Sequence, residues 1–422
     1  MEGTEYKINR LETTNLVGPM VDRHWAGLRE AKQRNEIVAW CAGPAIIWPY
    51  AMDMKAHFMA GYAAYCAGRR AGDQVLEVAR RDGELDDMCS YHRLHTGLAA
   101  AIRDNIPIKE EVVLPLPDVL ISSRLCTEMA HYSEILYRTM GIPVINVDMP
   151  IPCKEEDIPR LEKFYERQIR ESLIPRLEQV CDKPFNYDRM SEILAVSKEA
   201  AQIRNECWEF FKKKPTPWTL WDYGVGMGML FYMMGNPETI SYYKKLKEEL
   251  TERAKNNVPA IMPDGEKYRV MWDGWIPWAF LGKFIRKLSS HGAVPICGRY
   301  PWETAFFPEP EKIEPEPDPV HNYCHIWYSG MKGTYHTGPY GGVERIGELI
   351  EEYSVDGVIM FSSKTCRMWN LGQREIVDII DKRYNIPSVV IEADMIDSAM
   401  LSDAQIDTRL QAFFETIDAR RG

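Results

Sequence analysis

Two stretches of this chain repeat one pattern: an apolar strand, a cysteine, a helix-permissive segment and a second apolar strand. Residues 355–394 contain Ser362-Ser-Lys-Thr-Cys366, and residues 118–149 contain Ser122-Ser-Arg-Leu-Cys126. Both stretches close with Ile-Pro, an apolar run and Asp-Met. Each is a βαβ unit with its cysteine at the carboxyl end of the first strand, where open α/β sheets bind ligands. The repeat therefore predicts an internal duplication in which each α/β half directs one cysteine at a shared cleft.

The length of 422 residues exceeds what a single core supports, so several domains are expected. The fold class that we predict is α/β, with two Rossmann-like parallel-sheet halves and a helical insert between them. Charged amphipathic stretches after Pro150 indicate the insert. The expected boundaries are an N-terminal helical segment at 1–34, a first α/β domain at 35–152, the insert at 153–262 and a second α/β domain at 263–422.

Composition excludes several classes of function. A net charge of -11 argues against a nucleic-acid backbone as partner, since that requires a basic surface. No apolar run approaches the ~18 residues of a membrane helix, and the first thirty residues lack the apolar core of a signal peptide. We therefore expect a cytoplasmic protein with no membrane partner, whose ten cysteines do not form disulfides.

The cysteines are widely spaced, since the nearest two, Cys66 and Cys89, are 23 residues apart. This spacing excludes zinc ribbons and ferredoxin-type cysteine runs, so any metal ligands must converge from distant segments. Asp86 and Asp87 predict a helix start that places Cys89 in the first turn, where the helix dipole favours thiolate. The alternative is a core cysteine beside a helix cap.

Cys89, Cys126 and Cys366 thus each lie at the end of an element that faces the predicted cleft. Three thiolates suit an iron–sulfur cluster with one open iron, or a catalytic zinc with a free position. Soft sulfur without a histidine in the shared motif favours iron–sulfur. Three cations flank these cysteines and could donate hydrogen bonds to an anionic cluster: Arg124, Lys364 and Arg367.

His57 is a further candidate. Residues 50–72 carry methionine and aromatic side chains that predict an apolar helical face containing this histidine. A lone histidine on such a face is more often structural than catalytic.

Four motifs carry a resemblance to a known family: Asp87-Met-Cys-Ser-Tyr-His-Arg-Leu94, Ser122-Ser-Arg-Leu-Cys-Thr-Glu-Met129, Arg269-Val-Met-Trp-Asp-Gly274 and residues 355–373. They resemble the 2-hydroxyacyl-CoA dehydratase / benzoyl-CoA reductase family, in particular its benzoyl-CoA reductase B-type or dehydratase alpha-type subunits. The resemblance covers about residues 35–150 and 265–418, while the helical middle is less diagnostic.

The resemblance implies an iron–sulfur subunit that pairs with a homologous second subunit, usually as a heterodimer. Cys89, Cys126 and Cys366 would hold a [4Fe-4S] cluster between the two halves. A separate ATP-hydrolysing iron–sulfur activator would supply one electron at very low potential, and a CoA-thioester substrate would be reduced to a ketyl radical. The radical loses water in dehydratases, whereas in the reductases an aromatic ring accepts electrons and protons.

The first half departs from the dehydratase pattern. Dehydratase subunits carry serines after the first strand and a Pro-Glu-Asn segment in the next turn, where this chain has Cys41-Ala-Gly-Pro44 and Lys55-Ala-His-Phe58. No carboxylate replaces the glutamate, and His57 falls close to that segment, where it could donate a proton. This departure favours an aromatic acyl-CoA reductase over a dehydratase.

Three other readings stay open. A double-cubane [8Fe-9S] cluster would need six cysteines, with Cys41, Cys297 or Cys324 among the additional ligands; iron and sulfide counts distinguish it. A non-catalytic scaffold subunit would position CoA or the active partner. A binding protein with two hinged halves would take up a small molecule and carry no iron.

Overall fold

The computed structural model describes residues 6–152, 155–300, 307, 309–314, 317–330 and 338–422, with side chains from 342 onward in the last range. Its centre consists of two four-stranded parallel sheets. The first has the order β3-β2-β4-β5 and the second, read from the opposite edge, has the order β8-β7-β9-β10. The two orders are equivalent, with the first strand of each half beside both its second and its third. The predicted fold class of two Rossmann-like halves is therefore confirmed.

The strands follow the apolar runs of the sequence, because helices cover both faces of each sheet and leave no solvated side. In the first sheet the strands are β2 (Val38–Ala42), β3 (Lys55–Phe58), β4 (Val119–Arg124) and β5 (Val144–Asp148). In the second sheet they are β7 (Tyr268–Asp273), β8 (Ala293–Cys297), β9 (Gly357–Ser363) and β10 (Ser388–Ala393). A short antiparallel pair joins β1 (Lys7–Ile8) to β6 (Ile261–Met262).

The two halves share a backbone device at the end of their first strand. Gly43 follows β2 with φ +70°, and a Cβ there would stand 2.6 Å from the Ser123 carbonyl oxygen of β4. Gly274 follows β7 with φ +131°, and a Cβ there would stand 2.6 Å from the Phe361 carbonyl oxygen of β9. Both turns need glycine for its positive φ and for the close approach of a neighbouring strand. These equivalent glycines support the internal duplication.

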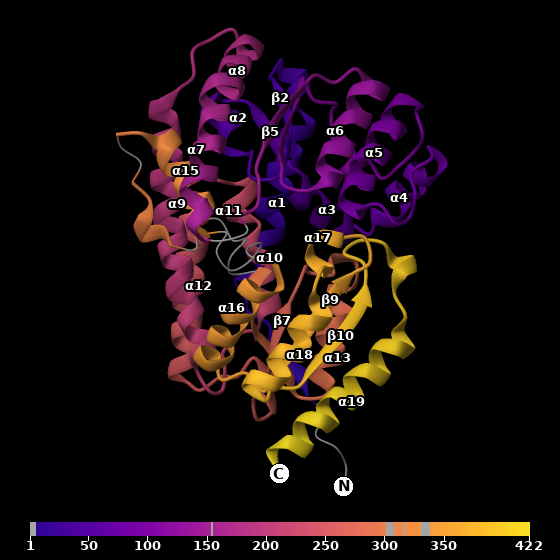
Figure 1. The fold of residues 1–422 in the computed structure, drawn as a ribbon, viewed down its shortest axis with the longest axis vertical. Helices are drawn as coiled ribbons and strands as arrows, with labels where there is room; N and C mark the ends of the chain where they lie inside the picture. The colour runs from indigo at the N-terminus through magenta and orange to yellow at the C-terminus, as the bar shows by residue number, and fades with distance from the viewer. Residues whose placement is uncertain (1–5, 153–154, 301–306, 308, 315–316, 331–337) are drawn as a thin grey trace.

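Helices fill the space around and between the sheets (Figure 1). The first half has α1 (Thr14–Arg29), α2 (Ile47–Ala51), α3 (Met59–Gly68), α4 (Gly72–Arg81), α5 (Ser90–Arg103) and α6 (Thr127–Met140). Between β5 and β7 come α7 (Ile158–Gln168), a π-helical turn η4 (Ile169–Leu173), α8 (Ile174–Cys181), α9 (Tyr187–Trp208), α10 (Leu220–Met227), α11 (Met229–Tyr232) and α12 (Glu238–Lys255). The second half has α13 (Leu281–Ser290), α15 (Pro319–Gly330), α16 (Gly338–Tyr353), α17 (Arg367–Asn370), α18 (Gln373–Tyr384) and α19 (Asp403–Arg421).

In Figure 1 the first half occupies the top of the molecule in indigo and purple, and the second half lies below it in orange and yellow. The helices between β5 and β7 run along one side of both halves, and short α17 points at the boundary where the halves meet. Within the described residues, no helix combines the length and apolar character that crossing a membrane requires.

One expected helix is wrong in its first part. Residues 50–72 are predicted as a helical face, but Lys55–Phe58 form β3, and a helix begins only at Met59. β3 pairs with β2, with Trp40 opposite His57. A four-residue edge strand is too short to show the alternation that distinguishes a strand from a helix, and the apolar helical stretch that follows it dominates the pattern.

Candidate functional site

Each of the three candidate cysteines lies at the amino end of a helix. Cys89 is the N-cap of α5, Cys126 the N-cap of α6 and Cys366 the N-cap of α17. Cys126 follows β4 and Cys366 follows β9, so both lie at the carboxyl edge of a parallel sheet beside its first strand. That is the switch point of the strand order, where open α/β sheets bind ligands. Helix amino termini add unpaired N–H groups that favour anions.

Hydrogen bonds between neighbours of the cysteines bring the three helix termini together. The backbone N–H of Cys89 donates to Glu128, two residues after Cys126, over 3.4 Å. The backbone N–H of Ser90 donates to the hydroxyl of Thr365 over 3.3 Å. Because Ser90 and Thr365 are the immediate neighbours of Cys89 and Cys366, these two bonds bring the backbone at the cysteines of the two halves together.

The pKa values of the thiols report the same proximity. Burial raises the pKa of Cys89 well above its ordinary value, Cys366 raises it further, and Cys126 contributes in the same direction. Burial also raises the pKa of Cys126, and that of Cys366 to about 11. Backbone N–H groups of the first turns oppose these shifts: those of His92, Met129 and Trp369 lower the pKa of Cys89, Cys126 and Cys366 respectively. The sequence-based expectation of a lowered thiol pKa at Cys89 is therefore wrong, because burial outweighs the helix terminus.

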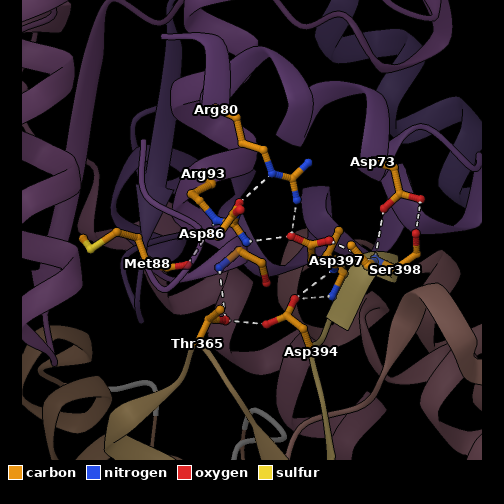
Figure 2. A network of polar contacts seen from close by, with 12 residues as sticks. Asp73, Arg80, Asp86, Met88, Arg93, Thr365, Asp394, Asp397 and Ser398 are labelled. Carbon is orange, nitrogen blue, oxygen red and sulfur yellow. Dashed lines mark hydrogen bonds and ion pairs between the residues drawn. The ribbon is translucent and has the colours of Figure 1, made fainter. Parts of the chain in front are cut away.

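A buried polar network fastens the two halves behind the thiols (Figure 2). The hydroxyl of Thr365 donates to the carboxylate of Asp394, which also accepts the backbone N–H groups of Ile396 and Asp397, each over 2.9 Å. Asp394 therefore fixes the loop that carries Thr365 and, through it, the position of Cys366.

The loop after β10, which begins with Asp394, reaches across to α4 and α5. Asp397 accepts Arg93 of α5 over 3.0 Å and Arg80 of α4 over 2.6 Å, and the Arg93 and Asp397 side chains are 0% and 2% exposed. Asp73 accepts the hydroxyl of Ser398 over 2.6 Å (Figure 2). We call the contacts of Asp397 with Arg80 and Arg93 the carboxylate latch. No local sequence pattern identifies the latch, because its partners are about three hundred residues apart.

Aromatic rings stand beside the Cys89 and Cys366 thiols. Trp275 follows the Gly274 turn and packs on Tyr300, with ring centroids 4.5 Å apart, and edge-on against Tyr91 at 5.6 Å. Trp369 lies 6.3 Å from both Trp275 and Tyr300. Tyr91 accepts the indole N–H of Trp278 over 2.8 Å. Tyr91 lies two residues after Cys89 and Trp369 three residues after Cys366, so both rings belong to helices that these cysteines cap.

The residues present fit an anionic iron–sulfur cluster. Several buried polar atoms around the thiols have no hydrogen-bond partner in the described part of the chain: Ser90 Oγ, His92 Nε2 and Trp275 Nε1. Hydroxyl and ring N–H groups left without acceptors are costly unless a ligand satisfies them, and cluster sulfurs are acceptors. Among the described residues, no three or more His, Cys, Asp or Glu side chains form a group that could hold a metal ion. The ligands of a single metal ion lie close together around that ion. The cysteines of an iron–sulfur cluster lie farther apart, because each of them binds a different iron.

The other candidate cysteines do not cap the three helices that carry the motif cysteines. Cys41 is buried on β2, Cys297 is buried on β8, and Cys324 lies within α15 beside Glu166 and Glu162. Two of the flanking cations are engaged with carboxylates: Arg124 with Asp148 over 2.6 Å and Arg367 with Asp87 over 3.2 Å. Cys153 lies outside the described residues.

The structure buries His57 completely on β3. Its Nε2 is 2.9 Å from Nε2 of His95, whose Nδ1 is 2.8 Å from the Tyr91 carbonyl oxygen. Because a carbonyl only accepts, His95 carries its proton on Nδ1, and His57 therefore donates from Nε2. Burial lowers the pKa of His57 well below its ordinary value, and His95 and His24 lower it further. His57 is thus a neutral side chain whose catalytic role stays a prediction.

Two Rossmann-like halves with cysteines at three helix amino termini define the class, a duplicated α/β protein. The particular family follows from comparison. The family described as 2-hydroxyglutaryl-CoA dehydratase, D-component, matches residues 49–417. Most of the chain is covered, and the chain belongs to this family.

Relatives are similar over nearly their whole length. The alpha subunit of lactoyl-CoA dehydratase from Anaerotignum propionicum is 26% identical, covering 93% of this chain and 93% of the relative. The B-type subunit of benzoyl-CoA reductase from Thauera aromatica is 26% identical, covering 84% of this chain and 82% of the relative. The alpha subunit of (R)-phenyllactyl-CoA dehydratase from Clostridium sporogenes is 25% identical, covering 93% and 92%. The dehydratase and reductase subunits thus have similar sequence identity to this chain.

Proposed function

We propose that this chain binds a [4Fe-4S] cluster through Cys89, Cys126 and Cys366 as a subunit of an enzyme that acts on CoA thioesters. The single observation that carries the proposal is the convergence of three helix-capping thiols, tied by the bonds from Cys89 to Glu128 and from Ser90 to Thr365. The alternative is a double-cubane [8Fe-9S] cluster, which needs more thiolates than these three, and iron and sulfide counts per chain distinguish the two.

The reaction that we propose is the reduction of an aromatic CoA thioester, as in a benzoyl-CoA reductase. The cluster, when bound, supplies low-potential electrons and an iron with a free coordination position. The chain's own residues hold the thiolates at helix termini, and Trp275, Tyr300 and Tyr91 exclude water and oxygen from them. Flat aromatic walls also suit a flat acyl group by ring stacking.

His57 is the proton donor that we assign to this reaction. Its hydrogen bond to His95 holds one ring nitrogen, and the described residues leave its Nδ1 without a hydrogen-bond partner. Because the Nε2 proton is donated to His95, Nδ1 would take up from solvent the proton that is delivered to the substrate, and release of that proton returns the ring to its neutral form.

The second candidate is dehydration of a 2-hydroxyacyl-CoA, which the names of the dehydratase relatives favour. An assay that follows both reactions decides between them: an aromatic acyl-CoA consumed with electron uptake supports reduction, and water loss without net electron consumption supports dehydration. We further propose a homologous second subunit and an ATP-hydrolysing iron–sulfur activator as partners, since the relatives are named as subunits of larger enzymes.

Replacing Cys126 with serine tests the cluster. The protein purified without oxygen should hold about four iron and four sulfide per chain, and Cys126→Ser should lose most of the visible absorption and all electron uptake. Cys181→Ser is the matched control, because Cys181 lies at the end of α8 in the helical insert and should leave both readouts unchanged. Full iron content and full activity in Cys126→Ser would remove this cysteine from the site.

A further inference from the structure

We propose that His321 and His325 of α15 form a second metal site, which binds one divalent ion of the zinc, nickel and copper class through the two Nε2 atoms. Water, or a ligand from outside the chain, completes the coordination of that ion. The site belongs to α15 and α7 and not to the helices that the three cysteines cap. The inference therefore does not depend on the proposed cluster.

The two histidines share the exposed side of α15. His321 and His325 are exposed, whereas the three residues between them, Asn322, Tyr323 and Cys324, are buried. Residues four apart on a helix are neighbours, and the two imidazole rings are nearly parallel, with centroids 6.3 Å apart and an interplanar angle of 19°. Two histidines at this spacing on one helix face are an arrangement that binds zinc in proteins. The buried thiol of Cys324 is not part of the ligand set.

Carboxylates of α7 orient both rings. Glu166 accepts a hydrogen bond from Nδ1 of His321 over 2.9 Å, and Glu162 accepts one from Nδ1 of His325 over 3.0 Å. Because a carboxylate only accepts, each neutral ring carries its proton on Nδ1 and its lone pair on Nε2. Histidine ligands of metal ions are commonly held by a carboxylate in this way, which fixes the ring and makes it a stronger ligand.

The two carboxylates are themselves held in place. The side chains of Glu162 and Glu166 are 11% and 19% exposed. Arg170 donates to the other oxygen of Glu166 over 2.8 Å, and over 2.7 Å to Asp318, which directly precedes α15. These contacts fasten α15 to α7 and neutralise the charge of the arginine. The imidazoles are therefore oriented before an ion arrives.

The Nε2 atoms are accessible to an ion. Both histidines and both glutamates line one surface hollow, together with Pro150 and other residues of α7. Nε2 of His325 lies 3.4 Å from Ser329 Oγ, a contact that is long for a hydroxyl donor and that an ion would displace at little cost. A small tilt of the two exposed rings brings both Nε2 atoms to the usual zinc–nitrogen distance of about 2.1 Å. Within the described residues, no third His, Cys, Asp or Glu completes the group, so the ion keeps open positions.

Equilibrium dialysis against Ni²⁺ tests the site. The untagged protein is purified without oxygen and dialysed in mildly alkaline buffer, in which exposed imidazoles are neutral. The parent should bind one more Ni²⁺ per chain than His321→Gln. His325→Gln should lose the same ion, and the double variant should lose no more than either single variant, because one imidazole cannot chelate. His131→Gln is the matched control: it removes an exposed histidine of α6 and should bind Ni²⁺ as the parent does.

Replacing a carboxylate tests the orientation of the rings. Glu162→Gln keeps both histidines but loses the negative charge behind His325, and it should weaken Ni²⁺ binding about 10-fold to 100-fold. An unchanged affinity in this variant would contradict the role of the carboxylates.

Two results would overturn the site as a whole. One is equal Ni²⁺ binding in the parent and in His321→Gln. The other is an ion half lost in each single variant and fully lost only in the double variant, since the rings would then bind separately. Iron content should be the same in the parent and in both single variants of α15, so failure of this inference and failure of the proposed cluster are seen in different measurements.

Discussion

At the scale of single residues, burial decides the charge state of the ionisable groups in the first half. His95 is fully buried, and burial lowers its pKa from 6.5 to about 3, with the Tyr91 carbonyl opposing the shift. His57 is lowered in the same direction. Burial therefore favours the neutral imidazole at both positions, so the core holds two histidines without burying a charge.

His95 predicts a loss of stability in mild acid. Below pH 6.5 the unfolded chain binds a proton at this residue, while the folded protein does so only near pH 3. Stability is therefore complete above pH 6.5 and falls as the pH decreases, by about 1 kcal/mol between pH 6.5 and 5.5 for this one group. Urea unfolding midpoints across that interval, above the usual carboxylate range, should decrease with falling pH.

Replacing the histidine should remove part of this dependence. His95→Gln should flatten the pH profile of the urea midpoint by one proton, although it lowers the midpoint itself through lost packing. Exposed Thr139 on α6 provides the control, because it does not titrate, and Thr139→Ala should keep the slope of the parent. Equal slopes in His95→Gln and the parent would show that His95 does not couple to folding.

At the scale of elements, the turns after β2 and β7 determine which residues reach the sheet edge. Gly274→Ala should destabilise the protein by roughly 1–3 kcal/mol from backbone strain alone, with the clash against the Phe361 carbonyl in addition. The readout is the denaturation midpoint. Gly27→Ala is the control: Gly27 lies in α1 with open space around its Cβ position, and alanine should leave the midpoint unchanged or raise it.

The elements were largely predictable from the sequence, for a physical reason. Strands buried on both faces appear as continuous apolar runs, so residues 118–123 and 356–361 identify β4 and β9 to within one or two residues. The strand β3 was not predictable, because a four-residue strand at the edge of the sheet is too short to show a strand-like pattern of apolar residues. The helix terminus at Cys89 was predictable from Asp86 and Asp87, but the thiol's pKa was not, because burial depends on the tertiary structure.

At the scale of the whole molecule, the carboxylate latch holds the halves in register. Asp397→Asn should cost about 3 kcal/mol, toward the lower end of the range for breaking a buried pair, because Asp86 still pairs with Arg93 over 2.7 Å. It should also loosen the site, seen as faster iron loss to a chelator. Asp87→Asn is the matched control, since its pair with Arg367 also crosses between the halves but is exposed, at 64% and 77%.

For Asp87→Asn we expect a change below about 1 kcal/mol and parental iron retention. Equal effects of the two substitutions would contradict a special role for the latch.

The latch could not be predicted from the sequence, unlike the cysteines of the site. The repeated motif identified Cys126 and Cys366, whereas Arg93 and Asp397 are joined only by the fold, and neither residue type nor spacing distinguishes them from surface charges.

The division of the thiols between two halves has a consequence for how the protein matures in the cell. Cys89 and Cys126 are synthesised with the first half, whereas Cys366, Thr365 and Asp397 are synthesised only with the last strands of the second half. A cluster held by all three cysteines would be inserted only after the second half has met the first. Assembly factors that deliver iron and sulfide would therefore encounter a folded acceptor, and chains that stall before β9 would remain without iron.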